Sequence, residues 1–257
     1  MPNEYACAVA LRSPRHFEWV ASIHPYRVDA LEALSRVAQD GARAVKWLPV
    51  AMGIDPASSR CDVFYALLAK LGLPLITHGG AELAVLGGDR QDYGNPLRLR
   101  RALDRGVTVV IAHCASFGKD QDTDRGANGP MVASFELFAR LMDEPRYVGK
   151  LFGDVSAVTQ INRVGVVKEI LSRTDWHARL LNGSDYPLPG VMPLFSTRGL
   201  IELELLDANV ADAISAVRGH NPLLFDFLLK RHIAYRGKRF PPSVFETRRF
   251  FDRRVHV

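Results

Sequence analysis

The sequence of 257 residues lacks the features that mark several large classes of protein. Its three cysteines, Cys7, Cys61 and Cys114, are far apart and odd in number. They indicate neither a disulfide framework nor a paired-cysteine metal site, so we expect reduced thiols. No apolar run approaches the roughly 20 residues that span a bilayer, and the first residues lack a basic start followed by an apolar core. We therefore expect a cytoplasmic protein with no membrane partner.

Other absences narrow the chemistry. No G-x-G-x-x-G follows an apolar segment, which argues against a dinucleotide-binding fold, and no G-x-S-x-G is present, which argues against a serine esterase. The segment DQDTDRG at 120–126 departs from a calcium-binding loop, because its glycine comes one place late and Met131 stands where a bidentate glutamate is needed. We interpret this segment as a solvated acidic loop.

Positive charge is in excess, with a formal net charge of +5 that gathers near the C-terminus in KRHIAYRGKRF and RRFFDRRVHV. Such a surplus raises the question of nucleic-acid binding. No nucleic-acid-binding motif accompanies the charge. We therefore expect no nucleic-acid partner, and interpret these residues as a basic tail that packs its arginine stems on the domain.

Helical patterns and short apolar runs alternate along the chain, in units of about 30 to 40 residues. The apolar runs are EWVASIHP, ARAVKWLP, LPLITHGG, VTVVIAHCAS, GKLFGDVSAV and HARLLNGSDYP. Alternation of this kind predicts an α/β fold with parallel strands covered by helices. The regular spacing, without a dinucleotide fingerprint, favours a (β/α) barrel over an open Rossmann sheet. Residues 196–231 are predicted to be helical, and no linker interrupts the sequence, so we expect a single domain over residues 1–257.

Four ionisable residues stand at or near the ends of predicted strands. His78 ends LPLITHGG, His113 ends VTVVIAHCAS, Asp185 follows LLNGS, and Lys46 lies in ARAVKWLP. Each has an ordinary explanation alone: a turn residue, a hydrogen-bonded core histidine, a helix cap and a lysine that reaches the surface. In a parallel barrel, however, strand ends meet at the face that carries catalytic groups. Burying all four there is costly unless they pair or bind a metal.

Two imidazoles and a carboxylate form a donor set that suits a divalent metal, with zinc expected and manganese or iron as alternatives. A bound ion of this kind lowers the pKa of water to about 7. In this interpretation His78, His113 and Asp185 are the ligands. Asp185 also accepts the proton of the water, and His113 orients the water or stabilises charge on the substrate.

The runs GARAVKWLPVAMGIDP, LPLITHGG, VVIAHCAS, LFGDVSAV, NGSDYPLP and HNPLLFDFLLKR resemble the amidohydrolase superfamily, and within it the amidohydrolase-2 branch of metal-dependent hydrolases and decarboxylases. The resemblance covers nearly the whole chain and implies a (β/α)8 TIM barrel. It implies His78 as the metal ligand of strand five, His113 as the histidine of strand six and Asp185 as the aspartate of strand eight. Lys46 matches a strand-four position where some relatives carry a carbamylated lysine, and here we expect it to bind substrate.

One family feature is missing, because the H-x-H pair of the first strand occurs nowhere in the sequence. The segment ASIHPYR, with His24, resembles strand three instead. We therefore expect an incomplete barrel that lacks strands 1 and 2, with Met1 as an internal start. Six strands cannot close an eight-stranded barrel, so open edges are expected to favour a homo-oligomer.

These expectations lead to a metal-dependent hydrolase that cleaves a C–N or C–O bond of a small molecule. A decarboxylase of the same branch is the nearest alternative. Two further alternatives stay open: a truncated, non-catalytic chain, and a metal-independent lactone hydrolase that uses Asp185 as the base. Substrate identity lies in loop shape and is not readable from the strand ends.

Overall fold

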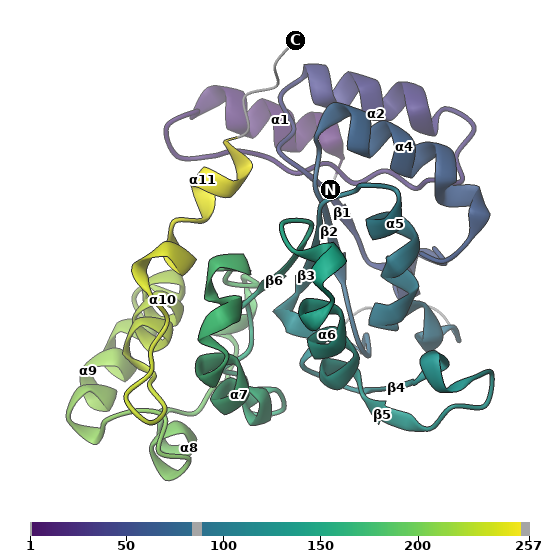
Figure 1. The fold of residues 1–257 in the computed structure, drawn as a ribbon. Helices are drawn as coiled ribbons and strands as arrows, with labels where there is room; N and C mark the ends of the chain where they lie inside the picture. Colours follow the sequence, from purple (N-terminus) through teal and green to yellow (C-terminus); the bar gives the residue numbers. More distant parts are fainter. Residues whose placement is uncertain (1, 84–88, 253–257) are drawn as a thin grey trace. The chain divides into compact units, whose positions relative to one another are not determined.

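The computed structural model describes residues 2–83 and 89–252 and has an α/β fold with parallel strands (Figure 1). The chain forms two compact units. The first comprises the residues up to Phe152 together with the segment from Arg248 onward, and the second comprises Gly153–Thr247. We expected a single domain over residues 1–257, and the division into two compact units does not test that prediction.

Three parallel strands form the centre of the first unit: β1 (Val45–Trp47), β2 (Leu75–His78) and β3 (Val109–Ala112). They are adjacent in this order, with β2 paired to both neighbours. All four residues of β3 are buried, as expected for a strand of apolar and β-branched residues that is covered on both faces. The predicted strand EWVASIHP is reduced to one parallel bridge between Ala21 and Val45.

The described residues of the first unit also form helices. They are α1 (Asn3–Arg12), α2 (Ala30–Gln39), α3 (Pro49–Met52), α4 (Asp62–Leu71), α5 (Arg100–Asp104), α6 (Ser134–Asp143) and α11 (Thr247–Phe251). Figure 1 shows α2 and α4 side by side, and they bury Leu34 and Leu68 at helical spacing from other apolar residues. Gly72 ends α4 with a φ of +64°, a conformation that glycine adopts without steric cost.

A two-stranded antiparallel hairpin, β4 (Lys119–Gln121) and β5 (Met131–Ala133), stands where we expected a solvated acidic loop. That expectation holds only in part: residues 123–126 are exposed, whereas the Asp122 side chain is fully buried. Both of its carboxylate oxygens accept hydrogen bonds from Arg140 on α6, at 2.6 and 2.7 Å. The two charge-assisted hydrogen bonds from the guanidinium group offset the cost of removing this carboxylate from water.

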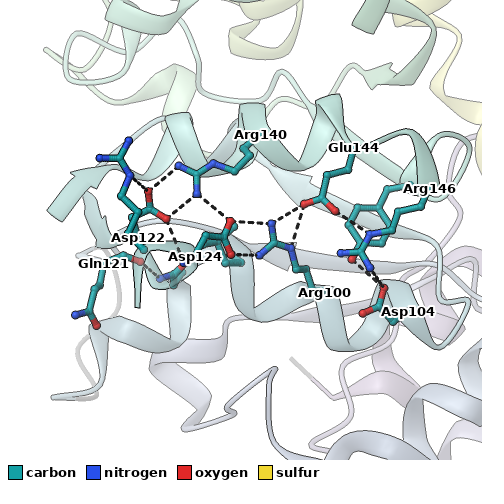
Figure 2. A network of polar contacts seen from close by, with 12 residues as sticks. Arg100, Asp104, Gln121, Asp122, Asp124, Arg140, Glu144 and Arg146 are labelled. Atoms are coloured by element: carbon teal, nitrogen blue, oxygen red, sulfur yellow. Dashed lines mark hydrogen bonds and ion pairs between the residues drawn. The ribbon is translucent and has the colours of Figure 1, made fainter. Parts of the chain in front are cut away.

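The hairpin belongs to a longer chain of ion pairs, drawn in Figure 2. Asp124 accepts hydrogen bonds from Arg140 and from Arg100 on α5, and Arg100 also binds Glu144 after α6. Arg146 continues the chain by donating to the other oxygen of Glu144, at 2.8 Å. This network ties the hairpin to two helices of the first unit.

The second unit contains the end of β6 (Leu151–Asp154), which pairs in parallel with β7 (Leu180–Leu181). Its helices are α7 (Val167–Ser172), α8 (Thr197–Glu202), α9 (Ala208–Arg218) and α10 (Pro222–His232). Asp207 caps α9, and Asn221 caps α10 with Pro222 in the first helical position. Figure 1 shows α9 and α10 packed side by side.

The α/β fold class, the strand in each apolar run from ARAVKWLP onward and the helical C-terminal region are thus confirmed. The strands are shorter than the runs that predict them. Residues 253–257, the end of the predicted basic tail, lie outside the described residues. Within the described part of the chain, the helices are too short or too polar to cross a membrane.

Candidate active site

His78 is the last residue of β2, and its side chain is buried. The chain turns at once through Gly79 and Gly80, where Gly80 has a φ of +84°. This turn brings the carbonyl oxygen of Ala81 to 3.1 Å from His78 Nε2. A carbonyl oxygen only accepts hydrogen bonds, so the network assigns the proton to Nε2. In the neutral imidazole, Nδ1 of His78 then carries a lone pair.

His113 follows β3 directly and is also buried. It begins three successive residues in the left-handed region, with φ values of 44°, 54° and 48° for His113, Cys114 and Ala115. None of them is glycine, and each such residue costs roughly 1 kcal/mol. Backbone strain of this kind gathers at functional sites, where surrounding structure holds it in place. Here it directs the imidazole of His113 toward His78.

The two imidazoles meet at close range. His113 Nε2 lies 3.1 Å from His78 Nδ1, and the ring centroids are 4.6 Å apart with an interplanar angle of 67°. Two ligands of one tetrahedral zinc ion, each bound at about 2.0–2.1 Å, are separated by about 3.3 Å. The spacing of the two nitrogens therefore fits adjacent ligands of one ion.

Glu82 is a third member of this cluster that the sequence analysis missed. Its Oε2 lies 3.2 Å from His78 Nδ1, and its side chain is 6% exposed, as is that of His78. Gln91 fixes its backbone, donating from Nε2 to the Glu82 carbonyl and accepting from the Glu82 N–H, both at 3.0 Å. The sequence signal that could have found Glu82 is its place as the first acidic residue after the strand that ends in His78.

The electron pairs of this cluster are balanced by a proton or by a cation. His78 Nδ1 faces a carboxylate oxygen that only accepts and a second imidazole nitrogen, and all three side chains are buried. Lone pairs that converge in a buried place repel one another unless a proton or a metal ion lies between them. The chemistry of these donors therefore fits a bound cation. Within the described residues, no group of three or more His, Cys, Asp or Glu side chains is already arranged to hold a metal ion.

Lys46 is the middle residue of β1 and is half-buried between the buried Val45 and Trp47. It is in register with Ile76 of β2. Because side chains alternate along a strand, Lys46 lies on the same face of the sheet as Ile76 and His78. The structure thus brings Lys46, His78 and His113 to one region of the first unit.

Asp185 belongs to the second unit, four residues after the end of β7. It has a φ of 55°, and it is exposed, unlike His78 and His113. The backbone of Asn182, at the start of this segment, is held by two acceptors: its N–H donates to the carbonyl oxygen of Val244 at 2.8 Å and to the side-chain Oγ1 of Thr247 at 3.0 Å. The position of Asp185 after a strand agrees with the role of metal ligand and proton acceptor that the sequence predicts. That role stays a prediction.

Comparison with known proteins gives a family and a fold. The model of the amidohydrolase family matches residues 1–223 of this chain. No curated protein sequence matches the chain significantly.

Solved structures are similar at low sequence identity. An uncharacterized TIM-barrel protein from Bordetella bronchiseptica is 20% identical, with a TM-score of 0.57 over 88% of this chain and 73% of its own. A candidate 2-pyrone-4,6-dicarboxylic acid hydrolase from Pseudomonas putida is 18% identical, with a TM-score of 0.50 over 72% of this chain and 62% of its own. A 2,6-dihydroxybenzoate decarboxylase from Rhizobium is 16% identical, with a TM-score of 0.49 over 72% of this chain and 65% of its own. The chain thus spans less than two thirds of the last two proteins, and its TIM-barrel fold class is confirmed by the first.

Proposed function

Because this chain belongs to the amidohydrolase family, we propose that it is a metal-dependent hydrolase that cleaves a C–N or C–O bond of a small molecule with water. The family generally uses a divalent metal ion and acts on small-molecule substrates. The observation that carries the proposal is the buried contact between His78 and His113 at the ends of neighbouring strands.

In this proposal His78, His113 and Asp185 hold the ion, and zinc is the expected metal because the donors are nitrogen and carboxylate oxygen. A divalent ion supplies a Lewis acid that lowers the pKa of water to about 7. Glu82 supplies a negative charge beside His78, which offsets the positive charge gathered there.

Three side chains carry proton transfer, charge stabilisation and substrate binding in this proposal. Asp185 is exposed, so its carboxylate is accessible to accept the proton of the attacking water and to return it to the leaving group. As a ligand, His113 would orient the water at the ion and so help to stabilise the oxygen that gains charge during the attack. Lys46, on the His78 face of the sheet, binds an anionic or polar group of the substrate and orients it.

A cytoplasmic location and a homo-oligomeric state remain part of the proposal. The register of β1 with β2 and the contact between His78 and His113 support a cluster of Lys46, His78 and His113 in the first unit. The contribution of Asp185 rests on its place at a strand end and on family membership.

The proposal is tested with a panel of small-molecule lactones, amides and aromatic carboxylates, assayed with and without a chelator. We expect hydrolysis of at least one lactone or amide that stops with the chelator and returns with Zn²⁺. Asp185→Asn should lose most of the turnover, whereas Asp212→Asn, an exposed aspartate of α9, should keep it. If a carboxylate releases CO2 and no substrate is hydrolysed, the protein is a decarboxylase and the proposed hydrolase function is wrong. Chelator-resistant hydrolysis would support the metal-independent alternative.

A further inference from the structure

A fully buried ion pair lies on α10 in the second unit. Lys230 Nζ and Asp226 Oδ2 are 2.6 Å apart, and their side chains are 0% and 1% exposed. Lysine and aspartate are almost never fully buried unless they are paired, and even a paired charge loses its hydration. A buried pair of this kind is therefore weak evidence for a stabilising role.

The ammonium group of Lys230 also reaches the segment between β7 and Asp185. It donates a hydrogen bond to the carbonyl oxygen of Gly183, and Asn182 Oδ1 lies 3.5 Å from Nζ. An ammonium group has three donors, and Lys230 has three acceptors around it. Two of them belong to residues that lie two and three places before Asp185.

Residues at the end of β6 and just after it also pack against this segment, at Gly183. A Cβ atom added to Gly183 would lie 3.3 Å from the Cβ of Ser156 and 3.8 Å from the carboxyl carbon of Asp154. Asp154 in turn accepts a hydrogen bond from the Ser156 N–H at 2.8 Å. The backbone at Gly183 is thus held between Lys230 on one side and this turn on the other.

The charges around the segment agree with this arrangement. Burial raises the pKa of Asp226, and the negative charges of Asp185 and Asp154 raise it further, whereas Lys230 lowers it. Asp226 thus lies among the charges of Lys230, Asp185 and Asp154. Oδ1 of Asp226 has no hydrogen-bond partner in the described part of the chain, so this carboxylate is engaged through Lys230 alone.

We propose that Lys230 is a positioning residue that fixes residues 182–185 through the Gly183 carbonyl and so sets the place of the Asp185 carboxylate. The inference rests on the proposed function for Asp185. It predicts that the amine of Lys230, and not the ion pair as such, is required for the position of Asp185. Loss of groups that orient a metal ligand typically weakens metal binding by about 10- to 100-fold.

Two matched variants separate the roles. Asp226→Asn keeps the Lys230 contact with Gly183, whereas the double variant Asp226→Asn, Lys230→Met removes it and restores the net charge of the wild type. Amide hydrogen exchange of peptides that cover residues 180–188 reports the order of the segment without any metal. Calorimetric titration with Zn²⁺ reports the affinity of the site.

We expect faster exchange in residues 182–185 and a Kd for Zn²⁺ raised about 10- to 100-fold in the double variant only. The Asp226→Asn variant should stay within about threefold of the wild type, because its segment keeps the Lys230 contact. If the double variant does not fold, Asp226→Asn with Lys230→Gln, which keeps an N–H donor, should show exchange close to that of Asp226→Asn.

Unchanged exchange in the double variant overturns the proposal, and so does faster exchange with unchanged Zn²⁺ affinity. A wild-type protein that binds no Zn²⁺, or an Asp185→Asn variant that binds it equally well, instead refutes the proposed function. In that case the exchange comparison still decides whether Lys230 holds the segment.

Discussion

His113 Nε2 and His78 Nδ1 lie 3.1 Å apart in a buried place, although 35 residues separate the two histidines in the sequence. The contact depends on two local turns: the glycine turn after β2 and the left-handed residues after β3. Together these turns direct two imidazoles toward one point at the ends of adjacent parallel strands, where TIM-barrel enzymes place their catalytic groups.

His78→Ala and His113→Ala should each weaken binding of a divalent ion by at least about tenfold, because each removes one nitrogen donor. Titration with Co²⁺, followed by its visible absorption, measures this loss directly. The matched control is His220→Ala, since His220 is an exposed histidine of the second unit. If all three variants bind Co²⁺ like the wild type, the histidine pair is not a metal site.

Glu82→Gln should reduce Zn²⁺ affinity by about tenfold while the fold is kept, because the amide has the shape of the carboxylate without its charge. Glu136→Gln, at an exposed position of α6, is the control. Calorimetric titration of both variants gives the two dissociation constants. Equal constants for both variants and the wild type would exclude an electrostatic role for Glu82.

Gly80→Ala should destabilise the protein much more than Gly41→Ala. Both glycines have positive φ, +84° and +82°, so both substitutions carry a strain of about 1 kcal/mol. Only at Gly80 would the new Cβ collide with backbone, at 2.3 Å from the Phe117 carbonyl oxygen, whereas nothing lies within 4 Å at Gly41. Overpacking adds about 1–3 kcal/mol, so the free energies of unfolding from urea titrations should differ by about that amount.

The sequence predicts the features of the site that depend on neighbouring residues, but not those that depend on contacts formed only in the fold. The strand β3 was predictable because four successive apolar residues require burial on both faces, and His113 was found by its place after that strand. The left-handed turn at His113–Ala115 was not, because none of its residues is a glycine that would signal positive φ. Glu82 was missed because its role comes from a contact with His78 across a turn, and its only signal in the sequence was its place as the first acidic residue after the strand.

The acidic hairpin shows the same limit. Asp122 and Asp124 in isolation predict a solvated loop, since carboxylates are usually exposed. The burial of Asp122 depends on Arg140, and Asp124 pairs with both Arg140 and Arg100. These arginines lie on two helices, 16 to 24 residues away in sequence. Charge pairing over such separations is fixed by the fold and cannot be read from composition.

Asp124→Asn should destabilise the protein at neutral pH and have no effect in acid. Hydrogen bonds from Arg100, with a smaller contribution from Arg140, lower the pKa of Asp124 from 3.8 to about 2. A lowered folded pKa contributes stability above pH 3.8, and this stability is lost as the pH falls toward 2. Because the side chain is about one third exposed, solvent screening reduces the expected loss to about 1 kcal/mol.

Guanidinium titrations of the wild type and Asp124→Asn at several pH values measure this contribution. Asp212→Asn, at an exposed position of α9, serves as the control and should be neutral throughout. A difference between the wild type and Asp124→Asn that persists unchanged at pH 2 would show that the ion pair is not its source.

The central claim, that His78, His113 and Asp185 share one divalent ion, is tested most directly by elemental analysis after dialysis against micromolar Zn²⁺. We predict about one ion per chain in the wild type and in Asp212→Asn, and less than half of that in Asp185→Asn and His113→Ala. A wild type that retains no ion, or an Asp185→Asn variant that retains a full ion, would contradict the account.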